Sequence, residues 1–353
     1  MVVKVSKPEL NLREKISELD KPSGVAGEAM LRAETPQEQF NLIGAGRRNL
    51  FMNGDFRISQ RGTSHTYSNS QSGFHTLDRI YSANFSSGTL ALSQQHAGHD
   101  GVDAPKFLRA TTASTVGASA TVYSRQSIEG IELFSNKQVT VSFMVKSNAS
   151  TTFQLRREYN YGSGGSSTQY DSFIDVPVTT SWTKFTHTYD AVDFSSKTIG
   201  SSNYYGIMFY WSTNQGSNTV RDGNIDITNV QIELGKVATP FEHRFTGEEL
   251  ALCQRYYQLN ISNTAFTNST TVARLGISGV VQMRAQPSLT IVDATGRVED
   301  FGIANRNLVS LASFSPGGAS GTMGGAVDAT ITSSSNQRSH ILFAGSIGLD
   351  AEL

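Results

Sequence analysis

The sequence is poor in cysteine and has almost no net charge. It contains one cysteine, Cys253, among 353 residues, and its formal net charge is −1. A single cysteine excludes a disulfide framework within the chain and a cysteine-rich zinc site, and it is typical of a protein made in a reducing cytosol. Because the chain has no basic surplus to hold a polyanion, we expect no nucleic-acid partner.

Long apolar segments are also missing. No stretch approaches the ~20 apolar residues of a membrane-spanning helix, so we expect no membrane insertion. The opening "MVVKVSKPEL" has no long apolar core and reaches Pro8 early, so we expect no secretory signal peptide. The chain instead has 32 glycines, and only 17% of its residues are charged. This composition is typical of short strands joined by many turns.

The length predicts roughly two to three domains, and the first of three segments covers residues 1–46. Leu12, Ile16 and Leu19 recur at the spacing of one helical face, and a second short helix is predicted around Phe40. Helices of this length are not stable alone in water, so their apolar faces need a partner surface. The segment is therefore either a helical cap on the next domain or an attachment and oligomerisation segment.

The second segment, residues 47–245, has the pattern of β-strands. In "QVTVSFMVKS" apolar and polar residues alternate, and "YYGIMFYW" places one set of side chains on each face of a strand. In "NIDITNVQIEL" the alternation slips by one residue, which predicts a β-bulge near 228–229. About ten such runs separated by turn residues indicate a mainly β protein with an antiparallel jelly-roll sandwich.

The third segment, residues 246–353, begins with a predicted connector helix and continues as a second, C-terminal β domain. Thr246 and Glu249 have the spacing of a capping box at the helix start. One face of this helix is predicted to contain Leu250, Cys253 and Tyr257. A catalytic thiolate needs an exposed electropositive site and a histidine base, so this face favours Cys253 as a packing residue.

The best candidate binding segment is "REYNYGSGGSSTQYD", residues 157–171. In it a Gly/Ser loop is flanked by Tyr159, Tyr161 and Tyr170, with Arg157 beside them. Flat aromatic rings against the C–H faces of a sugar, with a charged group for the hydroxyls, are typical of a carbohydrate site. A subunit contact is the alternative reading of the same loop. Trp182 is either a further sugar-stacking residue or part of the core.

No catalytic constellation can be located in the sequence. The separation of two carboxylates that would cleave a glycosidic bond is a spatial quantity, which sequence spacing does not give. The acidic residues lie mostly at predicted turns and helix starts. We therefore expect a protein that is not an enzyme, with no catalytic residues to assign.

Several motifs together resemble a known family. In order along the chain they are "RRNLFMNGDFRISQRGTS", "TLDRIY", "VTVSFMVKS", "SWTKFTHTY", "NVQIELGKVATPFEHR" and "EELALCQRYYQ". This set resembles tail-fibre and other appendage proteins of tailed bacteriophages, and its middle part is similar to the jelly-roll of carbohydrate-binding modules. The resemblance covers about residues 47–258.

The resemblance implies a virion protein, made in the host cytoplasm, that forms a homotrimer. Residues 1–46 would then attach it to other virion proteins, and its β domains would recognise polysaccharide on the host surface. The alternative is a purely structural virion protein, such as a collar, adaptor or capsid fibre. A polysaccharide-cleaving enzyme is the third reading.

The resemblance also implies a structural calcium ion. Jelly-roll sugar modules often hold calcium between their first and last strands, and the matching positions here are Asn53, Asp55 and Asp226. The chain departs from that pattern at Arg57, where the module family often has glutamate. Calcium is the only cofactor that the resemblance suggests.

Overall fold

The structure is a computed structural model of the whole chain. It describes residues 48–97, 101–114, 121–213, 222–260, 265–267, 272–278, 281–285, 287–291, 297–300, 304–316, 324–331, 340–344 and 347–353. The chain divides into two compact units, residues 1–48 and 49–353. The predicted docking residues Leu12, Ile16, Leu19 and Phe40 lie outside the described residues.

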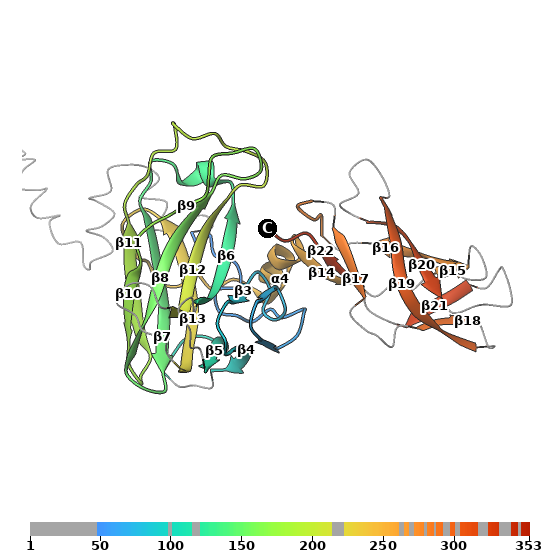
Figure 1. Cartoon of the computed structure of the whole chain (residues 1–353), viewed down its shortest axis with the longest axis horizontal. Coiled ribbons are helices and arrows are strands. Elements are labelled where there is room, and N and C mark those ends of the chain that lie inside the picture. Colours follow the sequence, from blue (N-terminus) through green and yellow to red (C-terminus); the bar gives the residue numbers. More distant parts are fainter. Residues whose placement is uncertain are drawn as a thin grey trace, which may run out of the picture. The chain divides into compact units, whose positions relative to one another are not determined.

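Two antiparallel sheets face each other in the second unit and form a jelly-roll sandwich (Figure 1). The six-stranded sheet contains, in spatial order, β1 (Ser64–Tyr67), β4 (Thr89–His96), β5 (Lys106–Ala113), β13 (Gly223–Leu234), β7 (Val139–Ser147) and β11 (Thr183–Tyr189). Nearly every neighbouring pair is distant in sequence. The sheet therefore forms only when the whole segment folds.

The seven-stranded sheet lies opposite. Its spatial order is β10 (Ile174–Val178), β8 (Thr151–Asn160), β12 (Tyr204–Thr213), β6 (Thr121–Glu129), β3 (Tyr81–Asn84) and β2 (Gln71–Gly73), and β9 (Gln169–Tyr170) also pairs with β8. The predicted mainly β, antiparallel jelly-roll is confirmed.

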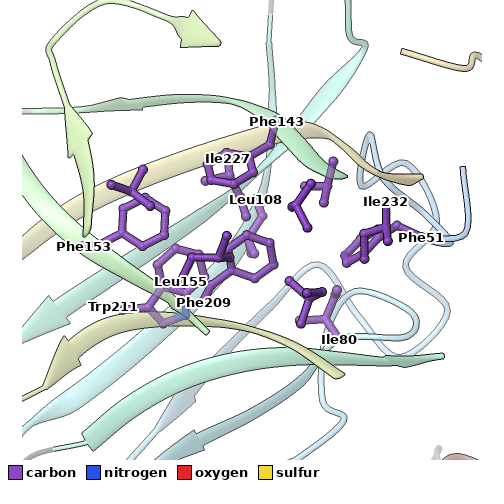
Figure 2. Packing of buried hydrophobic residues seen from close by; sticks show 14 of the residues in the cluster. Phe51, Ile80, Leu108, Phe143, Phe153, Leu155, Phe209, Trp211, Ile227 and Ile232 are labelled. Carbon is purple, nitrogen blue, oxygen red and sulfur yellow. The ribbon is translucent and has the colours of Figure 1, made fainter. Parts of the chain in front are cut away.

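Apolar side chains from both sheets fill the space between them (Figure 2). Phe209 of β12 lies at the centre, with its ring 5.5 Å from that of Phe143 and 5.8 Å from that of Trp211. The Trp211 indole N–H donates to the Ser124 hydroxyl at 2.8 Å, so this polar atom is satisfied inside the core. Alternate residues of β12 point inward, as its sequence pattern predicted.

A β-bulge interrupts the central strand β13. The pairing of β13 with β7 shifts between Thr228 and Gln231, and Asn229 adopts a left-handed backbone with φ 52°. Asparagine tolerates this conformation better than most residues. The bulge predicted at 228–229 is therefore confirmed, and it keeps both Ile227 and Val230 in the core.

Elsewhere in the described residues the structure has one 3₁₀-helix, one α-helix and two further groups of strands. They are η1 (Ile131–Phe134), α4 (Thr246–Gln254), the small sheet β14 (Tyr257–Asn260), β22 (Ile347–Asp350) and β17 (Ser288–Ile291), and the closed barrel β15 (Ala265–Thr267), β16 (Val272–Ser278), β20 (Gly324–Ile331), β19 (Ala304–Pro316), β18 (Arg297–Asp300) and β21 (His340–Ala344). No helix in the described ranges is long and apolar enough to span a membrane.

The connector helix α4 begins at Thr246, as predicted, but two details were wrong. The predicted capping box is absent, since Glu249 instead accepts a hydrogen bond from the backbone N–H of Asn53 at 2.5 Å. The helix also ends at Gln254, so Tyr257 lies in β14 and not on the helical face. In both cases tertiary partners outweigh the local helical pattern.

Cys253 is fully buried in α4, and burial raises the pKa of its thiol. The predicted packing role fits this position. We expect a thiol-specific reagent not to modify the folded protein at neutral pH, and to modify it at the rate of unfolding when denaturant is added. Mass spectrometry of the labelled chain measures this. Rapid labelling of the native protein would contradict a packing role.

The C-terminal residues join the sandwich through buried ion pairs. Glu352 pairs with both Arg61 and Arg79, and the Arg79 guanidinium lies 3.4 Å from the centre of the Tyr256 ring. Arg79 is 1% exposed. Because breaking a buried pair leaves an uncompensated charge, this contact ties the end of the chain firmly to the jelly-roll.

Asp78 directly precedes Arg79 in the chain and should make the stability of the fold depend on pH. Burial raises the pKa of Asp78 to about 6, although Gln60 donates two hydrogen bonds to its carboxylate. The folded protein therefore takes up a proton near pH 6, whereas the unfolded chain does so near 3.9. Protonation of Asp78 in the folded state raises the free energy of unfolding at low pH, and this gain is lost as the pH rises through about 6.

We expect the free energy of unfolding to fall by up to roughly 3 kcal/mol between pH 4 and pH 7 because of Asp78. Urea denaturation at a series of pH values measures this slope. Asp78→Asn should flatten it, whereas Asp190→Asn, a change at an exposed aspartate, should leave it unchanged. Equal slopes for Asp78→Asn and wild type would rule out this role.

Candidate functional site

A row of aromatic rings crosses the outer face of the seven-stranded sheet. Tyr81 of β3, Tyr123 of β6 and Tyr210 of β12 lie on neighbouring strands, with ring centres 6.3 and 5.4 Å apart. Phe74 extends the row at one end, 5.4 Å from Tyr81, and Phe173 at the other, 5.0 Å from Tyr210. We call these five residues the aromatic row.

The row exists because each strand alternates between two faces. In β12 the core receives Tyr205, Ile207, Phe209 and Trp211. Tyr210 therefore points to the opposite face, where it stands directly across from Tyr123 in the register of β12 and β6. Phe85 follows β3, lies 6.5 Å from Tyr123 and is 48% exposed. The row thus continues into a ring that is open to solvent.

Charged and hydroxyl groups surround the row and are held firmly. Arg125 pairs with Glu158 at 2.9 Å and donates to the Tyr204 hydroxyl at 2.7 Å. Its guanidinium lies 4.9 Å from the ring centre of Tyr81 and 4.8 Å from that of Tyr204. Burial raises the pKa of both Tyr123 and Tyr204. Both hydroxyls therefore stay protonated, and that of Tyr204 donates its hydrogen to Glu158 at 3.3 Å.

The structure places the four predicted sugar-binding residues in two different environments. Tyr159 and Tyr161 are 3% and 0% exposed and belong to the core, and Arg157 is buried and paired with Asp171 at 2.6 Å. Strand β8 reaches Asn160, so its alternation turns residues 157 and 159 inward. Their predicted role as a sugar platform is therefore corrected: these rings have no free face.

Tyr170 is the exception among the four. It is 45% exposed and donates a hydrogen bond to Glu158 at 3.3 Å. It therefore joins the outer face of the same sheet as the aromatic row, through β9. Trp182 lies at the start of β11 in the other sheet, half-buried, with its ring 5.5 Å from Phe107 and 4.9 Å from the Lys146 ammonium.

The three predicted calcium ligands do not form one site. Asp55 pairs with Arg57, and Asp226 pairs with Arg109 through two hydrogen bonds of 2.7 and 2.8 Å. The Asn53 side chain bonds to backbone atoms of nearby loops, including the N–H and carbonyl of Ile58. Each carboxylate is already neutralised by an arginine. Within the described residues, no three acidic, histidine or cysteine side chains are grouped as metal ligands.

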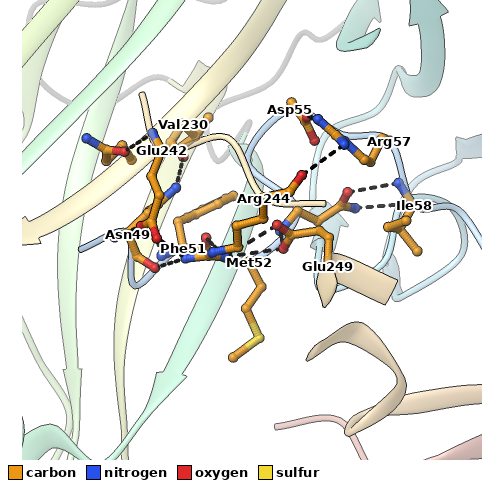
Figure 3. A network of polar contacts seen from close by, with 12 residues as sticks. Asn49, Phe51, Met52, Asp55, Arg57, Ile58, Val230, Glu242, Arg244 and Glu249 are labelled. Atoms are coloured by element: carbon orange, nitrogen blue, oxygen red, sulfur yellow. Dashed lines mark hydrogen bonds and ion pairs between the residues drawn. The ribbon is translucent and has the colours of Figure 1, made fainter. Parts of the chain in front are cut away.

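A buried arginine supplies positive charge in this region (Figure 3). Arg244 donates to the backbone carbonyls of Asn49 and Phe51, and it pairs with Glu249 at 3.4 Å and Glu242 at 3.7 Å. Its side chain is 4% exposed. The guanidinium thereby joins the first segment of the jelly-roll to the start of α4.

We expect Arg244→Met to lower the free energy of unfolding by about 3–5 kcal/mol, because Glu249 is left buried without a counter-charge. Chemical denaturation measures the loss. A chelator should not change the melting temperature of the wild-type protein. A drop in melting temperature with chelator that added calcium reverses would show that a metal ion stabilises the fold.

Comparisons with known proteins give no family but do give structural neighbours. No family model matches the chain, and no curated relative matches it. The family 11 carbohydrate-binding module from Clostridium thermocellum, in complex with a β-1,3-1,4-mixed-linked tetrasaccharide, is 12% identical, with 53% of this chain and 96% of the module covered and a TM-score of 0.32. The CBM22-1 xylan-binding domain from Paenibacillus barcinonensis Xyn10C is 14% identical, with 55% and 100% covered and a TM-score of 0.31.

A phage protein is also similar in structure. The enzymatically active domain of tailspike protein 4 of bacteriophage CBA120 is 16% identical, with 53% of this chain and 21% of that protein covered and a TM-score of 0.32. At these values none of the neighbours decides what this chain binds. The functional assignment therefore depends on its own side chains.

The aromatic row was missed by the binding-site prediction, although part of its signal is present in the sequence. The pattern "YYGIMFYW" places Tyr204, Met208 and Tyr210 together on the second face of a strand. The outer face of an antiparallel sheet usually carries polar residues, so three large residues there were the available sign of a covered surface, and all three are buried. The partners from β3 and β6 depend on strand order, which sequence does not reveal.

Proposed function

We propose that the jelly-roll binds a carbohydrate chain on the outer face of its seven-stranded sheet. The observation that carries this proposal is the aromatic row. Five rings follow one another, three of them on the adjacent strands β3, β6 and β12, and the centres of successive rings are 5.0–6.3 Å apart. Tyr210 is 5% exposed and packs between its neighbours, whereas the half-buried rings of Phe74, Tyr81, Tyr123 and Phe173 offer apolar surface to a chain of sugar rings.

The polar residues beside the row suit the same ligand. Sugar hydroxyls need donors and acceptors at fixed positions. The Arg125–Glu158 pair and the Tyr204 hydroxyl form one connected group on this face. These side chains hold each other in place before a ligand arrives. Binding would therefore cost little side-chain conformational entropy. This function is binding, and it requires no catalytic residue.

The broader biological role that we propose is a fibre or appendage of a tailed-phage virion that recognises host-surface polysaccharide. Support comes from the ordered motifs over about residues 47–258, which resemble those of such proteins. In this role residues 1–46 attach the chain to other virion proteins, and the chain assembles as a homotrimer. Three weak glycan sites on one particle would together bind far more tightly than one.

A purely structural virion protein is the second candidate. The burial of Tyr159 and Tyr161 favours it, because two of the three rings first expected to meet a sugar are packing residues. Under this alternative the aromatic row would be covered by another protein chain. Binding measurements on the row therefore distinguish the two functions.

We expect Tyr123→Ala to weaken binding to a recognised polysaccharide about tenfold, since it removes the central stacking surface. The measurement is binding of the fluorescently labelled full-length protein to host cells and to immobilised polysaccharides, with soluble polysaccharide as competitor. Phe245→Ala is the matched control, because Phe245 is 87% exposed and lies outside the aromatic row.

Equal binding by Tyr123→Ala and wild type would contradict the proposed site. If a folded wild-type protein bound no cell and no polysaccharide, the structural alternative would be favoured. Thermal melting of both variants establishes that any loss of binding does not come from unfolding.

A further inference from the structure

The outer face of the seven-stranded sheet contains an arginine without a counter-charge. Arg156 of β8 is partly exposed, and it has no ion-pair partner among the described residues. The other arginines of this unit whose side chains the structure describes differ. Arginines that pair with a carboxylate are Arg57, Arg61, Arg79, Arg109, Arg125, Arg157, Arg244, Arg255 and Arg284.

Two aromatic rings and one hydrogen bond hold Arg156 in place. Its guanidinium carbon lies 4.6 Å from the ring centre of Tyr170 and 4.5 Å from that of Phe173. Its Nε donates to the backbone carbonyl of Asp171 at 2.8 Å. These contacts use the ring faces and one N–H. The Tyr210 hydroxyl is also within hydrogen-bonding reach of the guanidinium. The two terminal nitrogens carry four N–H groups, so this contact leaves others for a ligand.

The neighbouring carboxylates are occupied elsewhere. Glu158 pairs with Arg125, and Asp171 pairs with Arg157. Asp175, on the adjacent strand β10, accepts a hydrogen bond from the Gln154 side chain. None of these three carboxylates forms an ion pair with Arg156. The positive charge of Arg156 is therefore available to a ligand that binds this face.

Arg156 is also adjacent to the aromatic row. Phe173 forms one end of the row and contacts both Tyr210 and the Arg156 guanidinium. A sugar that contacts the half-buried Phe173 ring would thus meet the remaining N–H groups of Arg156 with its substituents. A guanidinium fork binds the two oxygens of a carboxylate or sulfate group through parallel hydrogen bonds.

We propose that the glycan recognised by the aromatic row is acidic, and that Arg156 binds its carboxylate or sulfate group. This inference rests on the proposed carbohydrate-binding function and adds the charge of the ligand to it. A charge-assisted hydrogen bond is stronger than a neutral one. The protein should therefore bind an acidic glycan more tightly than a neutral glycan with the same backbone.

The test uses the full-length protein and pairs of glycans that differ only in charge. Polygalacturonate, alginate and hyaluronan are each compared with their carboxyl-reduced forms, and chondroitin sulfate with its desulfated form, alongside neutral dextran, mannan and xylan. We expect the protein to bind at least one acidic glycan, about tenfold or more tightly than the neutralised counterpart. The preference should shrink at high salt.

Arg156→Gln should bind the acidic glycan only as tightly as wild type binds the neutralised one, and should bind the neutralised glycan unchanged. Arg156→Lys keeps the charge but loses the fork, so it should restore the preference only in part. Lys137→Gln is the control, because it removes one positive charge at an exposed position outside this face.

Two results would overturn the inference and leave the proposed function standing. One is binding to a neutral glycan that Tyr123→Ala weakens and Arg156→Gln does not. The other is an acidic preference that Arg156→Gln retains in full. If the folded protein bound no glycan in the panel and none on host cells, both the inference and the proposed function would fall.

Discussion

The two-residue period of the β-strand is the constraint on which the rest of this structure depends. In β12 it sends Phe209 and Trp211 to the core and Tyr210 to the outer face. A shift of one residue in pairing would exchange these faces, exposing the core residues and burying the row. The hydrophobic core therefore holds the register that creates the aromatic row. The inner face of these strands provides the stability of the fold, and their outer face provides the proposed binding site.

Arginines provide the second layer of organisation. Arg244 joins the start of the jelly-roll to α4, and Arg79 joins the jelly-roll to the C-terminal residues. Both guanidiniums are buried against carboxylates, so their removal is costly although their presence adds little net stability. Arg125 likewise pairs with a carboxylate, that of Glu158, on the outer face of the seven-stranded sheet. Arg156 is held by two rings and a backbone carbonyl and has no carboxylate partner among the described residues, a departure from this pattern that suggests a ligand.

Local patterns in the sequence predicted several features correctly, and each failure had a tertiary cause. The jelly-roll class and the bulge at 228–229 were readable because alternation and its interruption are local properties. The capping box at Thr246 was wrong because Glu249 has partners at Asn53 and Arg244 that no local pattern reveals. The sugar platform at Tyr159 and Tyr161 was wrong because the predicted loop is in part a strand, which turns these rings into the core.

The sequence by itself determined which residues share a face of each strand, because side-chain alternation needs no information beyond the order of residues. It also determined the packing character of the Cys253 environment and the absence of a disulfide framework. Only the tertiary structure decided that β3, β6 and β12 lie side by side, and thus that Tyr81, Tyr123 and Tyr210 form a row. Strand order depends on which long-range pairings close the core, and that choice is made by the whole chain at once.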